Sequence, residues 1–265
     1  MAHKVLILAM GLSFLIAGSN DRPKSERGFK YRGKPIHPDC ISQLLLSESR
    51  SLSLKNFRSS SGFQEWEGRP GFLIAEYPEQ EFKGRRPYFA YLLIGQSDST
   101  FIMWTEEWGG GTGRFSNILF VDKSADELRL VKALGEGDRC NGGIIGAQLK
   151  GSDLYYSRET TPMGIIEEAD EKVDLVAYED LENSAASCVA QVKYRYSLVD
   201  HSDELISMTL AGKLSDQEDW TDRYTHQSCF NKVFNAYVDA GKTELSRDEL
   251  NEFVREFMKE CLGRQ

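Results

Sequence analysis

Apolar and polar residues alternate along much of the chain between residues 52 and 214, a period typical of strands with one buried face. The clearest example is Val189–Val199 (VAQVKYRYSLV), which indicates an antiparallel sheet with one side facing the core and the other facing water. Other segments share this texture and are separated by short polar turns, as in hairpins. The expected strands are Phe72–Tyr77, Tyr88–Gly95, Thr100–Glu106, Arg114–Asp122, Leu128–Ala133, Gly143–Leu149, Leu154–Arg158, Val189–Val199 and Glu204–Leu210.

The C-terminal part of the chain has a helical period instead. Apolar residues recur at three- and four-residue spacing in Phe230–Tyr237 and again in Leu250–Cys261. Ser246 and Glu249 have the spacing of a capping box at the start of the second segment. The pattern therefore predicts an α+β fold, in which a mainly antiparallel β domain (a sandwich or a curved sheet) carries a C-terminal α-helical hairpin. A shorter helix is expected after Thr161, an N-cap residue followed by proline.

The first residues have the pattern of a secretory signal peptide. Lys4 precedes the apolar run Val5–Ala17, and small residues follow at the positions that signal peptidase requires, Ala17 and Ser19. The run is shorter than the roughly 20 apolar residues that a membrane span needs. The expected organisation is a signal peptide at 1–19, a polar linker at 20–38, a mainly β domain at 39–215 and the helical hairpin at 216–265. After signal cleavage we expect no transmembrane span, and a location that is secreted or periplasmic.

Asp39 follows the linker and is expected to act as the N-cap of a short helix with the sequence ISQLLLS.

Five cysteines would meet an oxidising environment after export, and their odd number leaves one thiol without an intramolecular partner. Cys229 and Cys261 lie on the apolar stripes of the two C-terminal helices, so an antiparallel hairpin would bring them together. Cys140, in a glycine-rich turn, and Cys188, before the clearest strand, are the next expected pair. Cys40 is then the remaining thiol.

The chain carries 41 acidic and 32 basic residues, a net charge of −9. An acidic surface repels phosphate backbones, so we expect no nucleic-acid partner. The basic cluster of Lys83, Arg85 and Arg86 is interpreted as a solvated turn. Because no histidine or cysteine has metal-ligand spacing, we expect no metal and no cofactor.

The segment from Trp104 to Phe115 resembles a ligand site most. Trp104, Glu106, Glu107 and Trp108 precede a glycine run, and indole rings beside carboxylates could line a sugar-binding cleft. The competing interpretation is a hairpin whose glycines adopt positive φ while the tryptophans pack in the core. Adjacent Glu106 and Glu107 point to opposite faces of a strand, so hydrolysis would need a distant second carboxylate such as Asp138.

The motif Gly137–Gly143 (GDRCNGG) is interpreted as a tight turn whose Asn-Gly-Gly run supplies positive φ. A disulfide at Cys140 would fix this turn and present Asp138, Arg139 and Asn141 to a ligand. The motif, the segment LYYSRETTP and the C-terminal hairpin together resemble a group of exported bacterial proteins of uncharacterised function. That resemblance implies export and implies no activity for any residue.

The sequence favours a non-enzymatic exported protein that binds a protein or a cell-envelope component, with Trp104, Glu106, Trp108, Asp138, Arg139 and Asn141 as the candidate binding residues. Two alternatives remain open. One is a hydrolase of envelope glycan or peptide that uses acidic residues, and the other is a disulfide-stabilised enzyme inhibitor. No residue is assigned a catalytic role.

Overall fold

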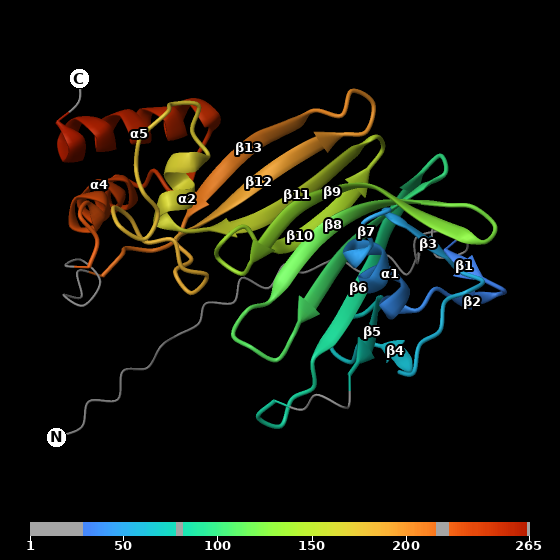
Figure 1. The fold of residues 1–265 in the computed structure, drawn as a ribbon. Helices are drawn as coiled ribbons and strands as arrows, with labels where there is room; N and C mark the ends of the chain where they lie inside the picture. The colour runs from blue at the N-terminus through green and yellow to red at the C-terminus, as the bar shows by residue number, and fades with distance from the viewer. Residues whose placement is uncertain (1–28, 78–81, 216–222, 264–265) are drawn as a thin grey trace.

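The structure is a computed structural model that describes residues 29–77, 82–215 and 223–263 (Figure 1). The expected signal peptide, residues 1–19, lies outside the described residues. Two antiparallel sheets make up most of the fold, together with α-helices, and the predicted α+β class is confirmed.

The larger sheet is a meander of seven strands in the order β3-β9-β8-β7-β6-β5-β4. Sequential hairpins build most of it, as the close spacing of strand signals predicts. The strands are β3 (Ser51–Ser53), β4 (Phe63–Glu65), β5 (Phe72–Glu76), β6 (Tyr88–Ser97), β7 (Thr100–Trp108), β8 (Phe115–Lys123) and β9 (Glu127–Asp138).

The smaller sheet has five strands in the order β10-β11-β12-β13-β14. The chain crosses from one sheet to the other at the turn between β9 and β10, the position of the GDRCNGG motif. Along β12 the even-numbered residues from Ala190 to Tyr196 are buried and the odd-numbered ones are not, so the alternation of the clearest strand is confirmed. The strands are β10 (Ile144–Lys150), β11 (Asp153–Thr160), β12 (Ala190–Ser197), β13 (Asp203–Leu210) and β14 (Glu244–Leu245).

Two hydrophobic cores cover the two faces of the seven-stranded sheet. On the inner face, side chains of both sheets pack together, with the rings of Phe120 on β8 and Tyr196 on β12 5.3 Å apart. On the outer face, helix α1 (Pro38–Leu46) packs against β3, β5, β6 and β9, and its Ile41 and Leu44 are fully buried. The result is three layers, with the larger sheet in the middle.

Residues 29–37, within the described part of the linker predicted at 20–38, differ from that prediction, and residues 20–28 lie outside the described residues. Residues 30–35 form a two-stranded ribbon of β1 (Lys30–Tyr31) and β2 (Lys34–Pro35), flanked by Phe29 and Ile36, which are 3% and 2% exposed. Phe29 and Ile36 anchor the ribbon in the outer core, and the polar composition around them concealed this. The N-cap of α1 is His37, not Asp39, because Pro38 already occupies the first helical position.

The predicted C-terminal helical hairpin is confirmed as α4 (Gln227–Asp239) and α5 (Arg247–Leu262), and the capping box at Ser246 is present. The shorter helix α2 (Pro162–Glu167) begins after its N-cap Thr161, also as predicted. In Figure 1, α2, α4 and α5 gather at one end of the molecule. Strand β14 lies between α4 and α5 and pairs with β13, so the hairpin is joined to the smaller sheet by backbone hydrogen bonds as well as by packing.

Both predicted disulfides are present. Cys229–Cys261 joins α4 to α5, and Cys140–Cys188 joins the β9–β10 turn to the segment before β12. Cys40 is the free thiol and is buried in the outer core. Burial, together with the negative charge of Asp39, raises the pKa of Cys40 to about 12.

Iodoacetamide at pH 8 is expected to leave Cys40 unmodified in the folded protein. A thiol whose pKa is about 12 carries a thiolate in only on the order of one molecule in ten thousand at that pH, and the thiolate is the reactive form. Unfolding without reductant should expose Cys40 and add one carbamidomethyl group, measured by intact mass. Rapid labelling of the native protein, or labelling of more than one thiol after unfolding, would contradict this expectation.

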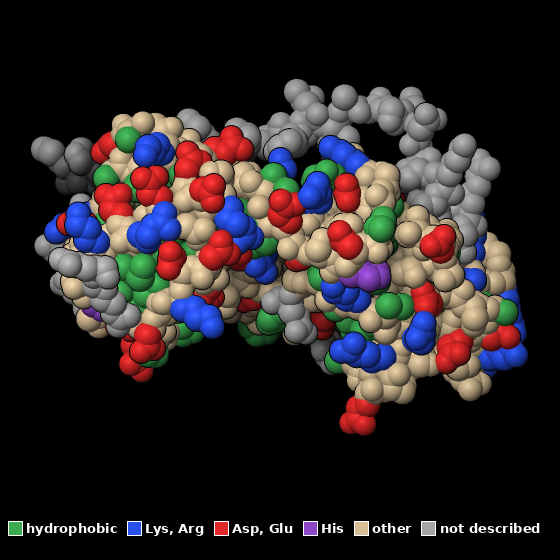
Figure 2. Space-filling model, turned by 90° about the horizontal axis from the view of Figure 1, so that it is seen from above, with side chains coloured by type: hydrophobic (Ala, Val, Ile, Leu, Met, Phe, Trp, Pro, Cys, Tyr) green, Lys and Arg blue, Asp and Glu red, His purple; other side chains and the backbone are tan. Residues whose placement is uncertain are grey.

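The face shown in Figure 2 carries Lys and Arg side chains intermixed with Asp and Glu. It lacks the continuous basic stripe that is typical of nucleic-acid-binding surfaces. None of the described helices combines the length and the apolar character that a membrane crossing requires.

Candidate functional site

The inner face of the larger sheet bears an aromatic and acidic row near one end of β5, β6 and β7. Tyr88 on β6 is the cross-strand partner of both Glu76 on β5 and Trp108 on β7. Directly paired residues share a face, and strand alternation places this row on the same side as the core residues Ile74 and Trp104. Glu76, Tyr88 and Trp108 therefore continue the inner core toward the sheet end.

A pocket of about 460 Å³ opens at this row. Its aromatic wall consists of Trp66, Tyr88 and Trp108. The ring centroid of Tyr88 lies 4.9 Å from that of Trp66 and 6.3 Å from that of Trp108. Three arginines from two neighbouring loops complete it. We call it the arginine–aromatic pocket, lined by Trp66, Ile74, Glu76, Gly84, Arg85, Arg86, Tyr88, Trp108 and Arg114.

The arginines give the pocket its charge. Arg86 lies 3.8 Å from the carboxylate of Glu76, an exposed pair that contributes little to stability. Within the described residues, no carboxylate forms an ion pair with Arg85 or Arg114. Guanidinium groups of this kind can bind an anionic group of a ligand through parallel N–H donors.

Glu106 lies one row deeper than Tyr88, and both of its carboxylate oxygens are occupied. The Tyr88 hydroxyl donates a 2.5 Å hydrogen bond to one oxygen, and the Arg69 guanidinium pairs with the other. Burial, followed by the hydrogen bond to Glu106, raises the pKa of Tyr88, so this phenol remains a neutral donor. Glu106 thus orients Tyr88 and balances Arg69.

Arg69 is held above three aromatic rings. Its guanidinium carbon lies 4.2 Å from the ring centroid of Phe72, 4.9 Å from that of Trp66 and 5.1 Å from that of Trp104. Trp104 is accordingly a core residue under this cation and does not line the pocket. Trp108 does line it, and its indole N–H donates a 2.7 Å bond to the carbonyl of Gly111, which fixes the ring.

Glu107 faces away from the pocket, as strand alternation requires. It pairs across the sheet with Phe89, a residue of the outer core. Burial raises the pKa of Glu107. The two adjacent glutamates consequently serve different sides of the sheet and do not act on one bond.

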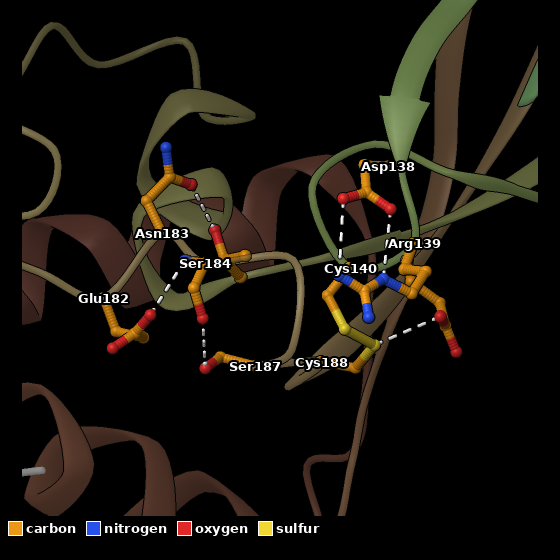
Figure 3. The surroundings of a disulfide bond; sticks show 10 residues. Asp138, Arg139, Cys140, Glu182, Asn183, Ser184, Ser187 and Cys188 are labelled. Atoms are coloured by element: carbon orange, nitrogen blue, oxygen red, sulfur yellow. Dashed lines mark hydrogen bonds and ion pairs between the residues drawn. A yellow bond between two sulfur atoms is a disulfide. The ribbon is translucent and has the colours of Figure 1, made fainter. Parts of the chain in front are cut away.

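The GDRCNGG turn is tied to the pocket through Asp138. The Asp138 carboxylate accepts a 2.6 Å bond from the backbone N–H of Arg114. It also accepts a 3.0 Å bond from Nε of Arg139 (Figure 3). Two regions selected from the sequence, the glycine run after Trp108 and the β9–β10 turn, therefore meet at Arg114. Asn141 is exposed and closes the turn through backbone bonds to Asp138.

The turn differs in backbone detail from the sequence expectation. Positive φ occurs at Arg139 (48°) and Gly142 (80°), and not at Asn141 or Gly143. Gly143 is needed for a different reason, because a Cβ there would lie 2.5 Å from the carbonyl oxygen of Arg139.

Several pocket residues escaped the sequence argument. Trp66 comes from the β4–β5 loop, and Arg85, which the sequence placed in a solvated turn, lies in the β5–β6 connection. Tyr88 appeared only as a strand residue, and Arg114 lay within the segment selected from Trp104 to Phe115 without being given a role of its own. One sequence signal could have indicated such residues, namely the alternation of buried and exposed positions along each strand. A tyrosine or arginine that falls on the buried side of this alternation near a strand end marks where the inner face becomes accessible.

One group of potential metal-ligating side chains occurs in the described part of the chain, namely Cys140, Cys188 and Glu159. The two sulfurs are bonded to each other, so the group offers a single carboxylate oxygen in this state. The side chains present do not form a metal site here.

Comparisons of the chain with protein-family models, with curated proteins and with solved structures give no match. The arginine–aromatic pocket is therefore the feature of the chain that indicates its function.

Proposed function

We propose that the protein is an exported, non-enzymatic binding protein, secreted or periplasmic, whose ligand occupies the arginine–aromatic pocket. The observation that carries the proposal is the combination of the Tyr88–Trp108 row with Arg85 and Arg114, to which no described carboxylate is paired. Aromatic faces stack on the apolar faces of sugar rings, and paired arginine donors match carboxylate or phosphate groups. The ligand class is thus an acidic sugar unit, as found in cell-envelope glycans.

The size of the pocket supports a small ligand or a chain end. A volume of about 460 Å³ lies within the range of small-molecule sites, which are mostly apolar with a few placed polar groups. Glu106 already orients the Tyr88 side chain, and the Gly111 carbonyl already orients that of Trp108. Binding a ligand would therefore cost little side-chain conformational entropy.

Export is supported by the N-terminal pattern and by the two disulfides, which persist in oxidising compartments such as the extracellular space.

A binding role is favoured over hydrolysis by the state of the acidic groups. Glycoside hydrolysis requires two carboxyl groups that converge on one bond, about 5–9.5 Å apart, with one of them free to give up a proton. Glu106 is engaged by Arg69 and Tyr88, Asp138 by Arg114 and Arg139, and Glu107 lies on the opposite face. These three carboxyl groups therefore do not supply such a pair in the pocket.

Calorimetric titration should show that a uronic-acid oligosaccharide binds to the protein. The methyl ester of the same oligosaccharide lacks the charge and should bind with an affinity at least about tenfold lower. Trp108→Ala and Arg114→Ala should each weaken binding by about tenfold or more, through loss of stacking and of the charged donor. Arg114→Ala keeps the backbone N–H bond to Asp138, so the loop should remain in place.

Arg195→Ala is the matched control, because this exposed arginine on β12 pairs with Glu204 away from the pocket and should not alter affinity. Equal affinity for the acid and the ester, or unchanged affinity in both pocket variants, would contradict the proposal. Appearance of new reducing ends during incubation would instead support the hydrolase alternative.

A further inference from the structure

The Cys140–Cys188 disulfide has one accessible half and one protected half. Cys140 is 3% exposed within the β9–β10 turn, whereas Cys188 is exposed in the segment that precedes β12 (Figure 3). Thiol–disulfide exchange begins when a thiolate reaches one sulfur in line with the bond. Access therefore directs attack to Cys188 Sγ and makes Cys140 Sγ the leaving group.

A carboxyl group stands beside this bond. Oε2 of Glu159, on β11, lies 3.1 Å from Cys188 Sγ. A carboxyl oxygen of Glu159 lies within 4.8 Å of both sulfurs of the disulfide. Neither disulfide sulfur carries a proton, so a favourable contact needs the proton on Glu159. Desolvation by burial raises the pKa of this carboxyl and favours its protonated form.

The position of Glu159 is fixed by its backbone. Its N–H donates to the carbonyl of Gly143 at 3.2 Å, and its own carbonyl accepts from Gly142 at 3.2 Å. Both partners belong to the turn that contains Cys140, so the carboxyl and the two sulfurs are held as one unit.

We propose that Cys140–Cys188 is a thiol-exchange site with Glu159 as the proton donor, and that its reaction partner is a thiol on a protein or a small molecule. The partner thiolate attacks Cys188 Sγ and forms a mixed disulfide there. The Cys140–Cys188 bond breaks with its electron pair on Cys140 Sγ, which receives the proton of Glu159. A second partner thiolate then attacks the partner sulfur of the mixed disulfide and displaces Cys188 as a thiolate, which takes up a proton that the partner thiols released to solvent on ionising. Two partner thiols are oxidised to one disulfide, and the bond in this protein is reduced to two thiols.

The second disulfide provides an internal comparison. Cys229 and Cys261 are both half-buried on the helical hairpin, and none of the described carboxyl groups forms a hydrogen bond with either sulfur. A common reagent should therefore distinguish the two bonds in the same molecule.

The test treats the native full chain with reduced glutathione at neutral pH, quenches it with acid and maps the cysteine adducts by peptide mass spectrometry. The glutathione adduct is expected on Cys188, with Cys140 as the free thiol, at least about tenfold faster than any reaction of Cys229–Cys261. Glu159→Gln should slow this reaction by about tenfold or more, since an amide cannot supply the proton. Glu252→Gln, on the exposed face of α5, should leave the rate unchanged.

Preferential reaction of Cys229–Cys261, an adduct on Cys140, or an unchanged rate in a folded Glu159→Gln variant would overturn the proposal. Thermal unfolding of each variant identifies loss of fold separately. The adduct position and the rate ratio of the two disulfides are measured on the unmodified sequence, so they test the proposal even if a variant does not fold.

Discussion

Gly137→Ala is expected to lower the free energy of unfolding by about 3 kcal/mol, because the backbone leaves no room for a side chain at this position. A Cβ on residue 137 would lie 2.5 Å from the carbonyl oxygen of Asn141 and even closer to the carbonyl of Gly142. These are backbone atoms of the turn that Cys140 anchors, so they cannot move aside as a flexible side chain could. The turn would have to open, and Asp138 would lose its bond to Arg114.

Thermal or denaturant unfolding would measure this loss, with Gly146→Ala on the adjacent strand β10 as the control. No atom lies within 4 Å of a Cβ at residue 146 and its φ is not positive, so that variant should be close to neutral. A stability loss below about 1 kcal/mol for Gly137→Ala would contradict the tight packing of the turn. A concurrent fall in ligand affinity is expected, because the same turn holds the backbone of Arg114.

Phe253→Ala is expected to cost about 3–5 kcal/mol of stability, the range for removing a buried aromatic ring. Phe253 on α5 is 0% exposed, and its ring centroid lies 5.7 Å from that of Phe230 and 5.1 Å from that of Tyr237 on α4. The cavity would form in the core that the helical hairpin shares with the smaller sheet.

This variant also tests whether the hairpin is a separate domain. Because β14 pairs with β13 and the core is continuous, unfolding monitored by far-UV circular dichroism and by tryptophan fluorescence should remain one coincident transition at a lower midpoint. Two separated transitions would show instead that the hairpin unfolds independently. Glu252→Ala, an exposed neighbour on the same helix, should stay within about 0.5 kcal/mol of the parent.

Local patterns predicted the elements of this protein well. Each expected strand is present, and the capping box at Ser246 and the proline after Thr161 mark real helix starts. These features rest on interactions within a few residues, namely the strand period, the caps and the turns, and such interactions are written in neighbouring sequence positions. The disulfide pairing could also be predicted from the sequence, because the apolar stripes of the helices and the positions of turns limit which cysteines can meet.

The site was only partly accessible to the same reasoning. Trp108 and Asp138 were selected for their chemistry, and Trp104 was selected with them although it lies in the core beneath Arg69. Both tryptophans lie on the same face of β7, so their alternation cannot distinguish them. What separates them is their depth along the strand, since Trp104 lies in the inter-sheet core and Trp108 borders the pocket.

The sequence by itself determined the longer strands and helices, the α+β class and the C-terminal hairpin, because each depends on spacing along the chain, and it indicated the two cysteine pairs that the structure contains. Only the tertiary structure decided that Phe29 and Ile36 anchor the supposed linker. It also decided that Arg85 and Arg114, from loops far apart in sequence, face the Tyr88–Trp108 row in one pocket. The reason is physical: registers between strands and the stacking of two sheets set those contacts, and neither is encoded in the periodicity of any single segment.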